Sequence, residues 1–155
     1  MPARRLAAVN AEIIDGLDAG YVESFLGYNT RRATLAIGDI FLREMAVHGL
    51  RPVDFTLLAL IARNPGVTSS QLCKLLDIQS SNLVALVDQL QQRRLIARRP
   101  HPRDGRAMGL HLTPVGARML KQAEATAAEV EERAAARLSR AERDTLIKLL
   151  RKIYA

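Results

Sequence analysis

The sequence is poor in the residues that line large cofactor sites and that cross-link secreted proteins. Its 155 residues include no tryptophan, three phenylalanines, three tyrosines and one cysteine. So few aromatic rings argue against a large ring-lined cofactor pocket. The single Cys73 excludes an intramolecular disulfide, which fits a reducing compartment.

Long apolar runs are also absent. No stretch approaches the roughly 20 apolar residues of a membrane-spanning helix. The first ten residues, MPARRLAAVN, contain no apolar run long enough for a signal peptide. We therefore expect a cytoplasmic protein with no membrane partner.

Motifs for catalysis and metal binding are missing as well. The sequence has no nucleophile elbow, no Gly-rich phosphate loop and no HExxH motif. His48, His101 and His111 do not have the spacing of metal ligands, and only one cysteine could assist them. We expect no enzyme, no metal site and no cofactor.

Positive charge is abundant and concentrated in one segment. The chain has a formal net charge of +7, and residues 93–113 (RRLIARRPHPRDGRAMGLHLT) contain six arginines against the single acid Asp104. Residues 95–97 lead into a loop over 100–105, and Met108, Leu110 and Leu112 alternate after it at strand period. A basic hairpin favours a polyanionic partner, nucleic acid before an anionic membrane surface, although a lone charge run can also be a solvated loop.

The remaining pattern is helical. Apolar spacing predicts helices over 21–48 and 52–63, a short helix through Leu72, Leu75 and Leu76, and a helix capped by Gln79 or Ser80 that carries Leu83 to Leu90. Two helices are expected after the hairpin, beginning at Pro114 and near Arg140. We expect capping boxes at Thr68–Gln71 and Ser139–Glu142, and a turn at 77–79. The seam of the helix after Pro114 is expected to consist of Val115, Met119, Ala123, Ala127, Val130, Ala134 and Leu138.

This order of four helices, two strands and two helices predicts a mainly α, winged helix-turn-helix fold in a single domain, 1–155. The outer helices are amphipathic and too long for the central unit to cover. We therefore expect residues 21–50 and 114–155 to form the dimerisation helices, and residues 52–113 to form the DNA-binding region.

Such a fold places the second helix of the helix-turn-helix in the major groove. Its apolar face is Leu83, Leu86, Val87 and Leu90, which leaves Ser80, Ser81, Asn82, Ala85 and Gln89 on the surface for DNA. The candidate DNA-binding residues are Ser80, Ser81, Asn82 and Gln89 on this helix, and Arg98, Arg103 and Arg106 on the wing.

The segment Asp104-Gly105-Arg106-Ala107, followed four residues later by Leu112-Thr113-Pro114-Val115-Gly116, resembles the wing signature of the MarR-type transcriptional regulators. Residues 71–76 and 83–90 resemble their helix-turn-helix. The resemblance implies a homodimer on a roughly palindromic DNA operator. It also implies that Arg106 enters the minor groove and that Asp104 orients Arg103 or Arg106. The family often has Thr and Arg where this chain has Val84 and Ala85.

Members of the family respond to small molecules, so the resemblance implies a repressor released by a small aromatic or anionic ligand. Tyr28 and Arg32 share a face of the first long helix and could bind such a ligand, or could be a core tyrosine and a surface arginine. A non-specific architectural DNA-binding protein is the alternative function. An enzyme or a protein-interaction module is a third.

Overall fold

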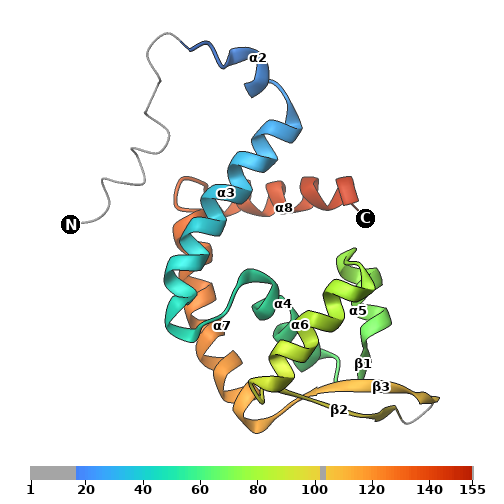
Figure 1. The fold of residues 1–155 in the computed structure, drawn as a ribbon. Coiled ribbons are helices and arrows are strands. Elements are labelled where there is room, and N and C mark those ends of the chain that lie inside the picture. The colour runs from blue at the N-terminus through green and yellow to red at the C-terminus, as the bar shows by residue number, and fades with distance from the viewer. Residues whose placement is uncertain (1–16, 102–103, 155) are drawn as a thin grey trace. The chain divides into compact units, whose positions relative to one another are not determined.

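The computed structural model describes residues 17–101 and 104–154, without the side chains of 101 and 104–107. The chain divides into two compact units, residues 1–36 and 37–155. The described residues are mostly helical, with one small antiparallel sheet (Figure 1). The prediction of a mainly α fold with a wing is confirmed.

The helix expected over 21–48 is interrupted, and this expectation was wrong in detail. Helix α2 spans Gly20–Glu23, α3 spans Leu26–Met45, and a 3₁₀ turn, η1, covers Ala46–His48. The Ser24 hydroxyl donates to the Tyr21 carbonyl at 2.7 Å, and the Asn29 amide donates to the Glu23 carbonyl at 2.7 Å. Such side-chain hydrogen bonds to the backbone compete with helical ones, which explains the break.

The helix-turn-helix follows the sequence closely. Helix α4 spans Pro52–Arg63, α5 spans Ser69–Leu76 and α6 spans Ser80–Gln92. The Thr68 hydroxyl accepts a hydrogen bond from the Gln71 amide N–H, and the Gln71 side chain accepts one from Thr68 N–H, as the capping box predicts. Asp77 takes a left-handed conformation with φ 50° and ends α5, so the chain turns sharply into α6.

The sheet has one strand more than expected. Strands β1 (Val67–Thr68), β3 (Asp104–Leu112) and β2 (Ile96–His101) pair antiparallel in that order. Gly109 pairs with Thr68, and a Cβ atom at Gly109 would lie 2.8 Å from the Gly66 carbonyl oxygen, so only glycine lets β1 approach this closely. The hairpin strands also extend into the loop expected at 100–105, since Pro100 pairs with Met108.

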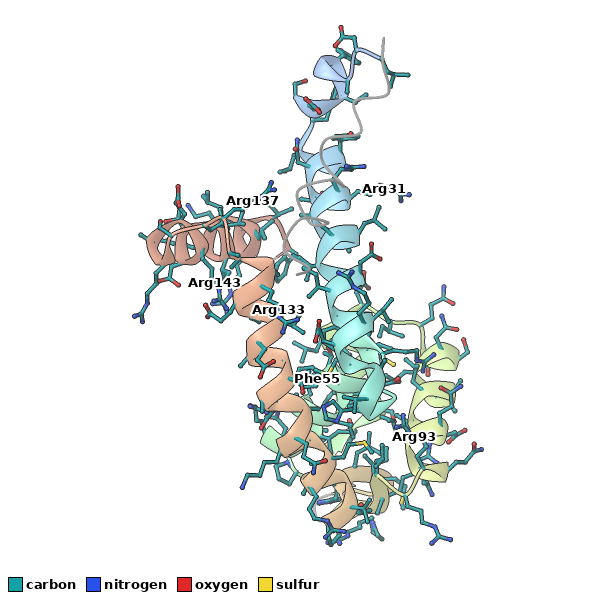
Figure 2. The ribbon with its side chains drawn as sticks, turned by 90° about the vertical axis from the view of Figure 1, so that its left-hand side faces the viewer. Arg31, Phe55, Arg93, Arg133, Arg137 and Arg143 are labelled. Carbon is teal, nitrogen blue, oxygen red and sulfur yellow. The ribbon has the colours of Figure 1, made fainter. Side chains whose placement is uncertain are left out.

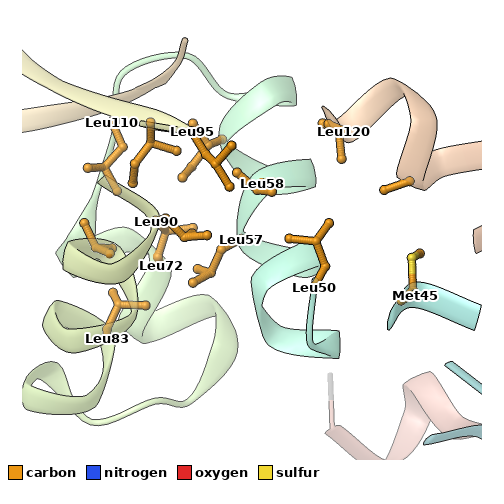
Figure 3. Packing of buried hydrophobic residues seen from close by; sticks show 14 residues of the cluster. Met45, Leu50, Leu57, Leu58, Leu72, Leu83, Leu90, Leu95, Leu110 and Leu120 are labelled. Atoms are coloured by element: carbon orange, nitrogen blue, oxygen red, sulfur yellow. The ribbon is translucent and has the colours of Figure 1, made fainter. Parts of the chain in front are cut away.

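The hydrophobic core lies in residues 37–155, between the helix-turn-helix, the sheet and α7, which spans Pro114–Ala134 (Figure 3). The predicted apolar face of α6 is confirmed, because Leu83, Val87 and Leu90 are buried and Leu86 is half-buried. Each fully buried side chain of this size contributes about 1.5–3 kcal/mol. The buried cluster comprises Met45, Leu50, Leu57, Leu58, Ile61, Leu72, Leu83, Val87, Leu90, Leu95, Ile96, Leu110, Leu120 and Ala123.

Helix α7 begins as expected but faces the core differently. Thr113 caps it, with its hydroxyl accepting from Gly116 N–H at 3.0 Å. The buried positions are Gly116, Leu120, Ala123 and Val130, while Val115 is 45 % exposed. The helix also ends before Leu138. The expected seam was therefore wrong at Val115, because Gly116 packs against the backbone of Leu95, and at Leu138, because α7 has already ended at Ala134.

The last helix, α8, spans Arg140–Tyr154 and buries none of its residues within one chain. The predicted cap is confirmed, since Ser139 N–H donates to the Glu142 carboxylate at 2.7 Å. Arg143 joins α8 to α7 through Glu131 at 3.0 Å and Glu132 at 3.1 Å (Figure 2). Leu146, Leu149 and Ile153 remain exposed on α8.

Within residues 17–101 and 104–154, no single helix is long and apolar enough to cross a membrane. Residues 26–48 and 52–63 pass that test of length and composition only together, as a pair joined by a bend.

Candidate nucleic-acid interface

The first turn of α6 presents three polar side chains to solvent. Ser80, Ser81 and Asn82 are all exposed, while Leu83 directly after them is fully buried. The apolar face therefore fixes which way this turn points. Backbone N–H groups at a helix N-terminus have no partner within the helix, so this turn can donate hydrogen bonds to phosphate or base edges.

The middle of the same exposed surface is apolar. Val84 is 44 % exposed and Ala85 is exposed. These side chains offer methyl groups and no hydrogen bonds to a DNA groove. A thymine methyl group is the base feature that such side chains match.

Gln89 is separated from this turn. It lies nine residues after Ser80, roughly 13 Å along the helix axis. Its Oε1 accepts a hydrogen bond from Arg51 Nη2 at 2.8 Å. The structure thus brings Ser80, Ser81 and Asn82 together but places Gln89 against the start of α4.

A buried carboxylate organises that contact. Asp54 is 3 % exposed, and its Oδ2 accepts from Arg51 N–H at 3.0 Å and from Arg51 Nε at 2.9 Å. Burial alone would raise the pKa of Asp54. The hydrogen bonds from Arg51, together with the charges of Arg51 and Arg93, outweigh burial and hold that pKa below its usual value. The carboxylate therefore stays ionised and keeps Arg51 directed at Gln89.

Arg93, at the end of α6, makes a second contact near Arg51, Asp54 and Gln89. Its guanidinium donates to the Gly49 carbonyl at 3.0 Å and to the His48 carbonyl at 3.3 Å (Figure 2). These carbonyls end η1, where a cation is favourable. The C-terminal end of α6 is thus joined to the segment that precedes α4.

The wing arginines fall into different environments. Arg98 on β2 donates to Asp88 at 2.6 Å and to Gln91 at 2.8 Å, both on α6. Arg99, its neighbour, is exposed. Arg103 lies outside the described residues. Asp104 and Arg106 belong to strand β3, and their side chains lie outside the described part of the chain.

The contact between Arg98 and α6 was not predicted, although the alternation of residues along β2 indicates which side of the hairpin Arg98 faces. Arg98 alternates with the buried Ile96, and its partner across the hairpin is the buried Leu110. Side chains paired in this way share one face of a hairpin. Arg98 is therefore on the core side, and Arg99 is on the other.

The candidate ligand residues Tyr28 and Arg32 lie one turn apart on α3. Tyr28 is half-buried and Arg32 is exposed. Their placement is compatible with either of the two roles considered for them.

An apolar cavity of about 390 Å³ lies among α3, α4 and α7 within residues 37–155. Phe41 and Phe55 stand edge to face on its wall, with ring centroids 5.9 Å apart. Arg63 and Glu124 form an ion pair at 2.9 Å and also line it. The sequence did not reveal this cavity, because the two phenylalanines that line it come from different helices.

A helix-turn-helix with an exposed polar first turn and a basic two-stranded wing defines the winged helix-turn-helix class of DNA-binding proteins. The sequence profile of the MarR family matches residues 48–107. The chain is 37% identical, over 93% of its length and 85% of the relative's, to a protein of Thauera aromatica assigned as a transcriptional regulatory protein for the hcr operon. The protein belongs to the MarR family of transcriptional regulators.

Solved structures of transcriptional regulators are similar to this chain. The transcriptional repressor CouR, bound to a 23-mer DNA duplex, is 34% identical with a TM-score of 0.85, over 90% of this chain and 99% of that chain. CouR bound to p-coumaroyl-CoA is 33% identical with a TM-score of 0.80, over 88% and 96%. Escherichia coli MarR in its apo form, at 22% identity and a TM-score of 0.70 over 84% and 98%, shares the fold.

Proposed function

We propose that this protein is a cytoplasmic, non-enzymatic, homodimeric repressor that binds a specific, roughly palindromic DNA operator. The observation that carries the proposal is the exposed turn of Ser80, Ser81 and Asn82, held outward by the buried Leu83 and followed by a basic wing. The similarity to CouR bound to a DNA duplex supports it.

In this proposal the first turn of α6 enters the major groove. Ser80 and Ser81 bind phosphate or base edges, and the Asn82 amide pairs with an adenine edge. Arg103 and Arg106 approach the minor groove from the wing, with Asp104 orienting one of them.

A second copy of the chain covers the apolar residues that one chain leaves exposed on α8. Leu146, Leu149 and Ile153 lie at helical spacing and are 45 %, 52 % and 59 % exposed. A dimer would also place two recognition helices one DNA turn apart, about 34 Å, which a palindromic operator requires.

The effector that we propose is aromatic and anionic. The similar repressor CouR has been solved with p-coumaroyl-CoA, which carries an aromatic ring and phosphates. The cavity beside Phe41 and Phe55 offers ring edges to an aromatic group. Tyr28 and Arg32 are a second candidate site and require a separate test.

Competition binding tests the DNA part. The purified protein is titrated onto DNA from upstream of its own and neighbouring genes, with excess random duplex at physiological salt. We expect a retained, protected site. Asn82→Ala should weaken that site by about 1–3 kcal/mol for one lost base contact. Gln92→Ala, a matched amide change at the last residue of α6, should leave it intact.

Release by a ligand is measured on the same complex. p-Coumaroyl-CoA is the first probe, and free CoA is its control. We expect the thioester to dissociate the protein from its site, and Phe41→Leu to need more thioester while binding DNA as before. Equal effects of the thioester and of free CoA would exclude the aromatic group as the determinant.

The alternative of a non-specific architectural DNA-binding protein is favoured by the exposed Val84 and Ala85, which cannot hydrogen-bond to bases. Such a protein would lose its labelled DNA at near-stoichiometric random competitor. The same titration therefore separates the two functions.

A further inference from the structure

Arg98 is placed to hold the wing rather than to contact DNA. Its side chain is 30 % exposed, and it shares the core-facing side of the hairpin with Ile96. From there it reaches the recognition helix, where its two terminal nitrogens bond Asp88 at 2.6 Å and Gln91 at 2.8 Å. Both ends of the guanidinium are thus occupied by the protein.

Asp88 is an acid on α6, the helix that we propose enters the major groove. A carboxylate on the recognition helix repels the phosphates of bound DNA, so on electrostatic grounds alone it lowers affinity. Pairing with Arg98 cancels that charge locally. Asp88 therefore favours DNA binding only if its ion pair with Arg98 has a structural effect, such as holding the wing in place.

A second arginine binds the recognition helix from another side. Arg51, at the start of α4, donates to Gln89, the residue next to Asp88. The C-terminal half of α6 is thus fixed to β2 through Asp88 and Gln91, and to α4 through Gln89. The first turn of α6 takes its direction from these anchors and from the buried leucines.

We propose that Arg98 is a positioning residue, which fixes wing strand β2 to recognition helix α6 through Asp88 and Gln91. The exposed Arg99, on the opposite side of the hairpin, is the β2 arginine that faces the DNA backbone. This inference rests on the proposed DNA-binding function, and it divides two adjacent arginines into different roles.

Salt dependence on a random duplex separates these roles without any operator. A direct phosphate contact contributes about 0.9 to the slope of log affinity against log salt. Arg98→Gln should leave the wild-type slope unchanged, and Arg99→Gln should reduce it by about one contact. A slope reduced for Arg98→Gln as much as for Arg99→Gln would overturn the proposal.

Asp88→Asn gives a test in which the two readings predict different effects on the preference for the specific site. If Arg98 positions the wing, the preference for the protected upstream site over a shuffled duplex falls about threefold to fivefold, as expected for a partly exposed ion pair. If Arg98 binds phosphate, losing the acid frees it, both duplexes bind more tightly to a similar extent, and the preference between them does not change. Asp77→Asn is the matched control, since it removes one acid from the turn before α6 at a left-handed position that asparagine tolerates.

Exchanging the charges distinguishes positioning from a general loss of structure. The double variant Asp88→Arg with Arg98→Asp keeps the net charge and restores the ion pair, so it should recover most of the lost preference. No recovery, in a variant whose thermal midpoint equals that of the wild type, would refute the positioning role. If the wild-type protein itself shows no preference, the proposed function fails, and the salt slopes still decide the role of Arg98.

Discussion

Replacing Gly116 by alanine should destabilise the protein, although alanine is the better helix former. Gly116 lies in the first turn of α7, and a Cβ atom there would lie 1.9 Å from the carbonyl oxygen of Leu95. A carbon and a carbonyl oxygen approach no closer than about 3.3 Å in favourable contacts. The helix, or the backbone at Leu95 just before β2, would therefore have to move by more than an ångström.

The Leu95 carbonyl is not free to give way, because it also accepts from Thr113 N–H at 3.0 Å. Overpacking a rigid site costs about 1–3 kcal/mol and occasionally more, and we place Gly116→Ala at about 3 kcal/mol. For a chain of this length the thermal midpoint should fall by roughly 6–12 °C.

Gly38→Ala is the matched control. Gly38 is also helical, but a Cβ atom there meets nothing within 4 Å in the chain. Here helix propensity should dominate, and the midpoint should rise by roughly 2–4 °C, for about 1 kcal/mol. Calorimetry at one protein concentration measures both variants. A Gly116→Ala protein as stable as the wild type would show that this close contact does not restrict the residue at position 116.

Three further predictions concern other parts of the chain. Asp54 has a lowered pKa when folded, so its stabilising effect is complete above the unfolded pKa of about 3.9 and is lost as the pH falls through the lower folded value. In Asp54→Asn the free energy of unfolding, measured with urea, should therefore depend less on pH below about pH 4. The same pH dependence as in the wild type would contradict this. Arg94 has φ 58°, a left-handed conformation that costs less for glycine. Arg94→Gly should therefore raise the free energy of unfolding, measured with urea, by up to about 1 kcal/mol. A decrease would show that contacts of the Arg94 side chain outweigh the backbone strain. Leu149→Glu on the exposed face of α8 should shift the protein to a monomer in sedimentation, and a persistent dimer would place the interface elsewhere.

The elements that the sequence predicts well are those defined by local chemistry. Helix α4 begins at Pro52 and ends before Asn64 as expected, and the Thr68 capping box starts α5. Proline at a first helical position and reciprocal caps act within a few residues, so they can be read from the sequence alone.

Features that depend on distant partners were missed. Strand β1 has only two residues, too few for a period, and exists because Val67 pairs with Leu110. The face of α7 depends on one backbone contact of Gly116. Contacts across the fold decide these features, and no local pattern encodes them.

Among the candidate DNA-binding residues, some positions follow from local sequence and others depend on distant contacts. Ser80, Ser81 and Asn82 follow from the apolar face of one helix, and the structure leaves them exposed. Gln89 was grouped with them by helical spacing, but its contact with Arg51 joins residues 38 positions apart. Arg98 could have been separated from Arg99 by the alternation of the hairpin alone.

Hydroxyl-radical footprinting on DNA upstream of the protein's own gene tests the central claim most directly. A homodimer that inserts the first turn of α6 from each copy should protect two symmetric stretches, about 10 base pairs apart, and should resist excess random duplex. Protection without symmetry, or its loss at near-stoichiometric random competitor, would contradict a sequence-specific dimeric repressor.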